Sequence, residues 1–171
     1  IETVGVGQRE ADIARLCDTT CYVAQPGSGD SVQFLKAGIL EVPHILVVNK
    51  EDMGNVARRT LAELKAALNR EHPDGDWEVP VLATSATTHA GIETLADVIH
   101  QHHNALKAQQ KLVSRRRRYQ SYWIHKRLQE EFGSFGIEQL GGEQLLLTQL
   151  EENELDLLQH YESLRARLNK V

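Results

Sequence analysis

The feature that most constrains the fold is a run of four apolar residues at 45–48, I-L-V-V, followed at once by the polar quartet N-K-E-D at 49–52. A short apolar run rich in β-branched residues predicts a buried strand. Such strands are typical of parallel sheets, whose two faces are covered by helices. In open parallel sheets, ligands bind beyond the carboxyl ends of the strands, which is where the polar quartet would lie.

The quartet has the pattern N-K-x-D, which suits recognition of guanine. The carboxylate of Asp52 can accept two N–H bonds from the guanine edge, and adenine cannot supply both of them. The stem of Lys50 can cover one face of the base, and the amide of Asn49 can bond the base and neighbouring backbone. Paired polar groups of this kind reject the wrong base, because their own hydrogen bonds would be lost. A buried strand that ends in an ordinary polar turn explains the same residues equally well.

Strands and helices are predicted to alternate along the first hundred residues. Further strands are expected at 19–24 and 79–83, and the helices are expected at 9–18, 31–40, 53–71 and from residue 92 onward. Strict alternation predicts an α/β fold, with a parallel sheet of about three to four strands and crossover helices. Every polar or glycine-rich loop that could bind a ligand then lies on one rim of the sheet.

The second part of the chain is predicted to be helical, so we expect two domains, residues 1–108 and 109–171. Glycines at 133–136 and 141–142 should interrupt the helices. The last helix is expected to have one apolar stripe, formed by Leu147, Leu150, Leu157, Tyr161, Leu164 and Leu168. This three-four spacing suits helix pairing. The stripe either packs on its own domain or forms an arm for dimerisation or for a partner protein.

Charge and composition narrow the partners. The net charge of −5 argues against nucleic acid as the main partner. No apolar run approaches the roughly 18 residues that a membrane-spanning helix needs, and the start does not resemble a signal peptide, so a cytoplasmic protein without membrane contact is expected. Cys17 and Cys21 are interpreted as reduced core residues rather than as a disulfide or a metal pair.

Three motifs occur in a suggestive order: E-x-x-G at 2–5, N-K-x-D at 49–52 and T-S-A at 84–86. Their order and spacing resemble the third, fourth and fifth signature motifs of P-loop GTPases, which have a three-layer parallel sheet. The finer pattern is E-T-V-G-V-G-Q at 2–8, then P-G-S-G-D-x-x-Q-x-x-K-x-G at 26–38, then V-V-N-K-x-D. It is similar to the methylmalonyl-CoA mutase-associated GTPases, also known as MeaB-like or lysine/arginine/ornithine transport-system kinases. The similarity covers residues 1–106 well and 115–132 more loosely.

The resemblance implies a role for each matching residue. Glu2 would act on the Mg²⁺ ion, through water, and Gly5 would contact the terminal phosphate. The guanine-binding residues would be Asn49, Lys50, Asp52, Ser85 and Ala86. A mobile segment called switch III would include Asp30, Gln33 and Lys36. The implied cofactors are GTP or GDP with Mg²⁺. The implied partners are an adenosylcobalamin-dependent acyl-CoA mutase, which such GTPases load and protect, and a second copy bound through the carboxyl-terminal helices.

Two departures from the family pattern limit what this chain should do alone. The phosphate-binding motif G-x-x-x-x-G-K-[ST] occurs nowhere in the 171 residues, and Val6 stands where a catalytic glutamine could follow Gly5. The chain begins without Met at what resembles the end of a strand, so we expect it to be the carboxyl-terminal part of a longer protein. We expect it to bind GTP poorly and to hydrolyse it negligibly when isolated. Alternatives are a GTPase chaperone of another metallocentre, such as a nickel site, and a non-hydrolysing helical interaction module.

Other conspicuous residues have ordinary interpretations as well as functional ones. The basic run at 115–118 would form a solvated helix face or contact carboxylates of a dimer mate, with phosphate or nucleic-acid binding as the alternative. His100 and His103 could share a helix face, but no carboxylate or cysteine joins them at metal-ligand spacing. Trp77 and Trp123 are expected to pack in the protein rather than to stack on a ligand.

Overall fold

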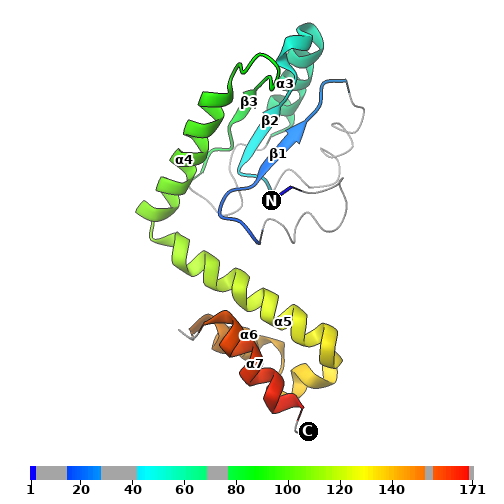
Figure 1. The fold of residues 1–171 in the computed structure, drawn as a ribbon, viewed down its shortest axis with the longest axis vertical. Helices are drawn as coiled ribbons and strands as arrows, with labels where there is room; N and C mark the ends of the chain where they lie inside the picture. The colour runs from blue at the N-terminus through cyan, green and yellow to red at the C-terminus, as the bar shows by residue number, and fades with distance from the viewer. Residues whose placement is uncertain (3–14, 28–41, 69–76, 153–155, 170–171) are drawn as a thin grey trace. The chain divides into compact units, whose positions relative to one another are not determined.

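The computed structural model describes residues 1–2, 15–27, 42–68, 77–152 and 156–169. The chain divides into two compact units, residues 1–108 and residues 109–171 (Figure 1). The first unit contains a sheet and its helices, and the second is helical. The fold class is therefore α/β with a helical carboxyl-terminal part, as predicted.

Three parallel strands form the sheet in the order β1-β2-β3. They are β1 (Cys21–Ala24), β2 (Ile45–Val48) and β3 (Val81–Ala83). The middle strand β2 is buried along its whole length, which explains why it is apolar at every position. In the register, Ala24 is paired with Val48, and Val48 is paired with Ala83. The carboxyl ends of all three strands therefore lie side by side.

Strands β1 and β3 each begin two residues later than predicted. Before β1, Thr19 and Thr20 are engaged elsewhere: Thr19 Oγ1 lies 2.8 Å from Nδ1 of His102, and the carbonyl of Thr20 accepts the N–H of His44 at 2.8 Å. Before β3, Pro80 has no N–H to donate to a sheet ladder, although its carbonyl accepts from Leu46 at 2.9 Å. Local polar partners and proline thus shorten the regular strands.

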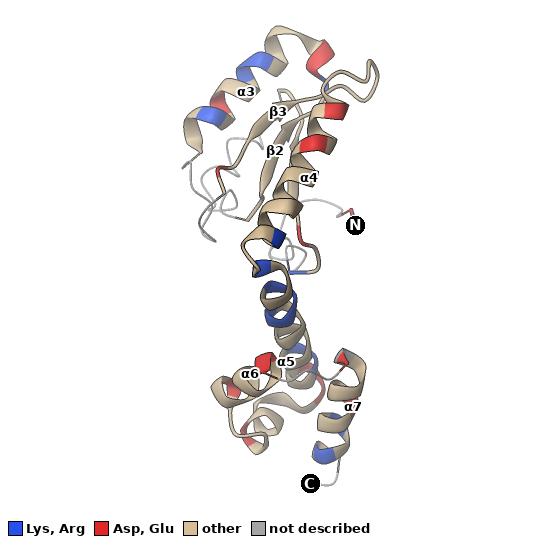
Figure 2. Ribbon diagram, turned by 90° about the vertical axis from the view of Figure 1, so that its left-hand side faces the viewer, with Lys and Arg blue, Asp and Glu red and all other residues tan. Residues whose placement is uncertain are grey.

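Helices α3 (Asn55–Ala67) and α4 (Ile92–Ala108) lie on opposite sides of the sheet (Figures 1 and 2). Helix α3 buries Ala57, Thr60 and Leu64, which recur at the spacing of one helix face. It begins two residues later than predicted because a 3-10 turn, η2 (Glu51–Met53), precedes it.

Two other helix predictions fall largely outside the described residues. The expected helix at 31–40 lies there entirely, as do residues 9–14 of the expected helix at 9–18. The described part of the latter, residues 15–18, forms turns and bends. Leu16, in this described part, is 57% exposed. The prediction that this helix continues to Asp18 was therefore wrong.

Buried histidines connect α4 with the amino ends of the strands. His44 and His102 are almost fully buried, and their rings lie 4.4 Å apart between centroids. The N–H of Thr20 donates to Nδ1 of His44 at 3.0 Å, and the indole N–H of Trp77 donates to the carbonyl of His44 at 2.8 Å. Trp77 is thus a packing residue, as predicted, and His102 belongs to the interior of the first unit.

The second unit consists of α5 (Lys111–Gln139), α6 (Glu143–Glu152) and α7 (Leu157–Leu168). Helix α5 has non-helical backbone at Gly133, where φ is 66°. It ends at Gln139 and is closed by Gly141 and Gly142, which both have positive φ. The N–H of Gly141 donates to the carbonyl of Glu138, and that of Gly142 donates to the carbonyl of Ile137. Glycine tolerates the left-handed conformation that closes a helix in this way. The predicted interruptions are confirmed at both places.

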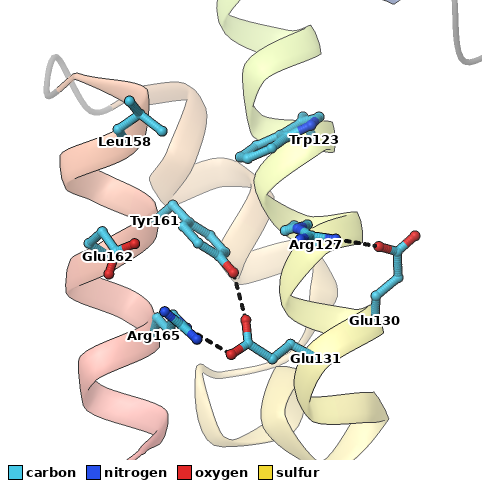
Figure 3. Close-up of a pocket in the computed structure, with 8 residues that line it drawn as sticks. All are labelled: Trp123, Arg127, Glu130, Glu131, Leu158, Tyr161, Glu162 and Arg165. Atoms are coloured by element: carbon cyan, nitrogen blue, oxygen red, sulfur yellow. Dashed lines mark hydrogen bonds and ion pairs between the residues drawn. The ribbon is translucent and has the colours of Figure 1, made fainter.

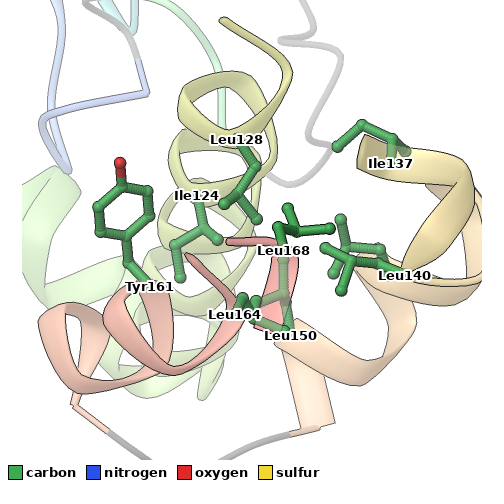
Figure 4. Close-up of a cluster of buried hydrophobic side chains, with 9 residues drawn as sticks. Ile124, Leu128, Ile137, Leu140, Leu150, Tyr161, Leu164 and Leu168 are labelled. Atoms are coloured by element: carbon green, nitrogen blue, oxygen red, sulfur yellow. The ribbon is translucent and has the colours of Figure 1, made fainter. Parts of the chain in front are cut away.

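The apolar stripe packs inside its own unit, which was one of the two alternatives. Leu150, Tyr161, Leu164 and Leu168 are buried against Ile124 and Leu128 of α5 (Figure 4). The prediction of one continuous last helix was wrong, because α6 ends at Glu152 and α7 begins at Leu157. Asp156 caps α7 by accepting the N–H of Leu158 at 2.9 Å. In α6, Leu146 is buried, whereas Leu147, which was predicted to belong to the stripe, is only half-buried.

No helix in the described ranges is long and apolar enough to cross a membrane.

Candidate functional site

Two polar loops meet at the carboxyl ends of β2 and β3. The N-K-x-D loop (residues 49–52) follows β2, and the T-S-A loop (residues 84–86) follows β3. The sheet ladder continues into both, because Thr84 N–H donates to the carbonyl of Val48 at 2.8 Å and Asn49 N–H donates to that of Ala24 at 3.0 Å. Sheet register therefore places the two loops next to each other, as expected for parallel strands.

The backbone of the N-K-x-D loop turns sharply at Lys50. Its dihedral angles, φ 61° and ψ 45°, lie in the left-handed region, which costs a residue with a side chain about 1 kcal/mol or more. The next N–H, that of Glu51, donates to the carbonyl of Thr84 at 2.9 Å. This bond fastens the strained turn to the neighbouring loop and offsets part of its conformational cost.

Side chains join the loops at two further points. The hydroxyl of Ser85 donates to Oδ1 of Asp52 at 2.6 Å, and Asn49 Oδ1 accepts the N–H of Ala86 at 3.3 Å. Ser85 is fully buried, and its Oγ also accepts the N–H of Thr88 at 3.2 Å. A buried hydroxyl with both a donor and an acceptor partner has a fixed position. Ser85 therefore fixes the orientation of the Asp52 carboxylate.

The surface of the joined loops remains open to a ligand. Lys50, Asp52 and Ala86 are exposed, and Asn49 is half-buried. The carboxylate can accept N–H groups from a ligand, and the amide of Asn49 has both donors and an acceptor. The bond from Ala86 to Asn49 is long enough for a ligand carbonyl to share the N–H. The arrangement suits a planar heterocycle with two adjacent N–H donors beside a carbonyl, which describes guanine.

Gly91 closes the loop that follows β3. Its φ is +71°, and a Cβ built on it would lie 2.2 Å from the carbonyl oxygen of Ala83. Nearby, Ser85 N–H donates to the carbonyl of Ala90 at 2.9 Å. Only glycine allows the chain to pass so close to the end of β3. The sequence showed Gly91 as the end of a loop, but not this contact.

A further residue of the site was not predicted from the sequence. Gln25 directly follows β1, and its Oε1 accepts a hydrogen bond from Nζ of Lys50 at 3.0 Å. Its position in the sequence could have identified it, because it follows β1 directly and the carboxyl end of β1 lies on the same rim as those of β2 and β3. Gln25 therefore extends the site across all three strands.

The structure brings together the five residues predicted to bind guanine. Glu2 is exposed. Gly5, Asp30, Gln33 and Lys36 lie outside the described residues, so their predicted roles in phosphate contact and in switch III stay predictions. Among the residues that the structure describes, no group of three or more His, Cys, Asp or Glu side chains could hold a metal ion. The exposed carboxylate of Glu2 has the hard oxygen ligands that Mg²⁺ prefers, usually alongside water.

The helical unit has a pocket of its own, between α5 and α7, with a volume of about 510 Å³ (Figure 3). In its lining, the carboxylate of Glu131 accepts from the hydroxyl of Tyr161 at 2.6 Å and from Nε of Arg165 at 2.7 Å. Trp123 packs edge-on against the ring of Tyr161, with the centroids 5.7 Å apart. Trp123 is therefore a packing residue that also lines an open surface.

The network at Glu131 predicts an acid-sensitive helical unit. Its hydrogen bonds to Tyr161 and Arg165 hold the pKa of Glu131 below the ordinary value of 4.5. A lowered folded-state pKa means that the stabilisation is complete above about pH 4.5 and is lost as the pH falls through the folded-state value. The urea midpoint of this unit should therefore fall as the pH is lowered below about 4.5, and less steeply in Glu131→Gln. If the urea midpoint depended on pH equally in the unmodified protein and in Glu131→Gln, this role of Glu131 would be contradicted.

The basic run at the start of α5 is not simply a solvated face (Figure 2). Arg115 is buried, its Nε donates to the hydroxyl of Tyr119 at 2.7 Å, and its guanidinium lies 5.4 Å from the centre of that ring. Arg118 lies 5.8 Å from the same ring centre. Of the alternatives given for this run, the solvated helix face does not hold for Arg115, since Tyr119 one helical turn later offers it both a hydroxyl and a ring face.

Both cysteines are free thiols and are half-buried rather than in the core. Burial, and secondarily the neighbouring Cys17, raise the pKa of the Cys21 thiol. A raised pKa lowers the thiolate fraction and with it the reactivity of the sulfur.

Comparison with known proteins agrees with this geometry. The chain is an α/β protein in which neighbouring parallel strands end in joined N-K-x-D and T-S-A loops. The family model described as methylmalonyl Co-A mutase-associated GTPase MeaB matches residues 1–137. The chain belongs to this family.

Relatives come from archaea, bacteria and animals. A protein of Pyrococcus abyssi that is named as a GTPase is 41% identical over 134 residues, which are 77% of this chain and 39% of the relative. The GTPase ArgK of Escherichia coli is 33% identical, over 77% of this chain and 40% of its own length. The methylmalonic aciduria type A homolog of Caenorhabditis elegans, named as mitochondrial, is 31% identical, over 78% of this chain and 34% of its own. The chain thus spans about two fifths or less of these relatives.

Proposed function

We propose that the joined loops bind the guanine base of GTP and GDP in a protein that hydrolyses GTP. The observation that supports this most strongly is the 2.6 Å hydrogen bond from the buried Ser85 to the exposed Asp52. It fixes a carboxylate at the carboxyl rim of a parallel sheet, before any ligand is present. Preorganised acceptors of this kind bind a matching edge without the cost of ordering themselves.

Each residue of the two loops then has a task. Asp52 accepts the two N–H groups on one edge of guanine, and Lys50 covers a face of the ring with its stem. Asn49 keeps the loops together through Ala86, whose N–H can turn to the guanine carbonyl oxygen. Adenine has an amino group where guanine has that oxygen, and it lacks the paired N–H donors. Adenine would thus leave several polar groups of the site without partners.

The phosphate end of the nucleotide requires residues beyond these loops. Glu2 would hold Mg²⁺ through water, and Gly5 would contact the terminal phosphate by its N–H. A bound Mg²⁺ would offset the negative charge of the phosphates. The 171 residues contain no G-x-x-x-x-G-K-[ST] motif, which surrounds the phosphates in P-loop proteins. We therefore propose that this chain alone binds GTP weakly and has negligible hydrolytic activity.

The proposed partner is an adenosylcobalamin-dependent acyl-CoA mutase, since the description of the family names association with methylmalonyl-CoA mutase. GTP hydrolysis would time the loading and protection of that enzyme. Residues 30–36, with Asp30, Gln33 and Lys36, would report the nucleotide state to it. The helical unit would form a homodimer. Its exposed apolar residues Val113, Phe135, Leu145 and Leu158 support a surface for a protein partner.

Calorimetric titration of the complete protein with Mg·GDP and with Mg·ADP tests the proposed base preference. We expect GDP to bind at least about 100-fold more tightly, because a site built around paired hydrogen bonds rejects a base that cannot form them. Equal affinities for the two nucleotides would overturn the proposal. The same titration of the present chain should give only weak heats, and micromolar affinity there would contradict our account of the phosphate end.

A further inference from the structure

We propose that Gln25 is a positioning residue of the guanine site, which holds the side chain of Lys50 in place before the nucleotide binds. The inference rests on the proposed function and adds to it a residue from a third strand. Gln25 belongs to neither the N-K-x-D loop nor the T-S-A loop. Its contact is a hydrogen bond of 3.0 Å between its Oε1 and Nζ of Lys50.

Sheet register explains why these two residues meet. Ala24 is the partner of Val48 in the parallel pairing of β1 with β2, and Asn49 N–H donates to the carbonyl of Ala24 at 3.0 Å. Gln25 is the next residue along β1, and Lys50 follows Asn49 at the end of β2. The pairing thus brings the end of β1 beside the turn that contains Lys50. The long side chains of Gln25 and Lys50 span the remaining distance.

Lys50 is held at both ends as a result. Its backbone is fixed in the left-handed conformation, with the following N–H bonded to the carbonyl of Thr84 across the site. Its ammonium group is held by Gln25 on the opposite side, that of β1. The aliphatic stem therefore lies between two fixed points, although the residue itself is exposed.

In the proposed site, the aliphatic stem of Lys50 covers one face of the base, so holding the stem in place before binding should favour binding. A free lysine side chain samples many rotamers, and ordering them opposes binding. An ammonium group donating to a neutral carbonyl oxygen forms a charge-assisted hydrogen bond, which is stronger than a neutral one. Gln25 thus orders part of the Lys50 side chain before the nucleotide binds, so that less conformational entropy is lost on binding. Lys50 contacts the face of the base, so the effect of Gln25 on nucleotide affinity should not depend on which groups stand on the guanine edge.

The matched test is Gln25→Met in the complete protein, because methionine keeps the length of the stem and removes the acceptor. We expect the affinity for GDP to fall about 3- to 10-fold, which is the worth of one such bond. The ratio of GDP to IDP affinity should stay constant, since IDP lacks only the amino group that faces Asp52. Gln25→Glu keeps an acceptor and should retain GDP affinity to within about twofold.

A double-mutant cycle separates positioning from a general structural effect. In the Lys50→Met background, Gln25→Met should cause no further loss of GDP affinity, because the side chain that it positions is gone. The proposal is overturned by a full loss in that background, by an unchanged affinity in Gln25→Met alone, or by a Gln25→Glu variant as weak as Gln25→Met. If the unmodified protein binds GDP and ADP equally, the proposed function itself fails, which is a different result.

Discussion

Replacing Gly91 with alanine should destabilise the first unit by about 2–5 kcal/mol and weaken nucleotide binding with it. Two costs add up: the left-handed φ of +71° and a Cβ that would lie 2.2 Å from the carbonyl oxygen of Ala83. That carbonyl belongs to β3 and cannot move aside without disturbing the sheet. The displaced loop includes Ser85, whose N–H donates to the carbonyl of Ala90.

Gly27→Ala is the matched control for this prediction. Gly27 also has a positive φ, +74°, but a Cβ there would meet Val56 Cγ1 at 3.4 Å, which is an ordinary van der Waals contact. This variant should therefore have the conformational cost alone and be at least about 1 kcal/mol less destabilising than Gly91→Ala. Urea unfolding can be followed by the emission of Trp77, whose indole bonds to His44, in a Trp123→Phe background. Equal losses for the two glycines would show that the close contact with Ala83 is absent.

Truncating Leu128 should have a comparably large effect on the second unit. Leu128 is 0% exposed and lies in the cluster that joins α5, α6 and α7. Leu128→Ala removes buried methyl groups and leaves a cavity, which costs about 2–5 kcal/mol. Trp123, which packs against this cluster, reports the transition in a Trp77→Phe background.

Leu158→Ala provides the comparison, because Leu158 is 64% exposed. Its replacement should change the free energy of unfolding by less than about 0.5 kcal/mol. A small effect at Leu128 would mean that the apolar stripe of α6 and α7 is not buried within this unit. The stripe would then be available to a partner, which is the other alternative that its spacing allows.

The sequence predicted the centre of the fold well, because there a single physical cause dominates. Strand β2 is buried on both faces, so its residues are all apolar and its boundaries, Ile45 and Val48, are evident. Once a parallel sheet is inferred, the loops after β2 and β3 must be neighbours. Asp52 and Ser85 could therefore be assigned to one rim although 33 positions separate them.

The sequence was less informative where several weak local effects compete. The first residue of β1 depends on the hydrogen bonds made by Thr19 and Thr20, and that of β3 depends on the missing N–H of Pro80. The three-four spacing from Leu147 to Leu168 favoured one helix, and it did not reveal the cap at Asp156 that begins α7. Gln25 was missed because its contact with Lys50 depends on strand register, for which no single residue gives a signal.

The central claim is that the N-K-x-D and T-S-A loops recognise guanine through Asp52. The most direct measurement is the affinity of Asp52→Asn for GDP and for xanthosine diphosphate, in the complete protein. In Asp52→Asn, an amide N–H₂ donor replaces one carboxylate oxygen acceptor. The variant should therefore bind xanthine, which has a carbonyl oxygen in place of the guanine amino group. We predict that GDP affinity falls at least about 100-fold and that the xanthine nucleotide becomes the preferred ligand. An unchanged preference for GDP would contradict the account.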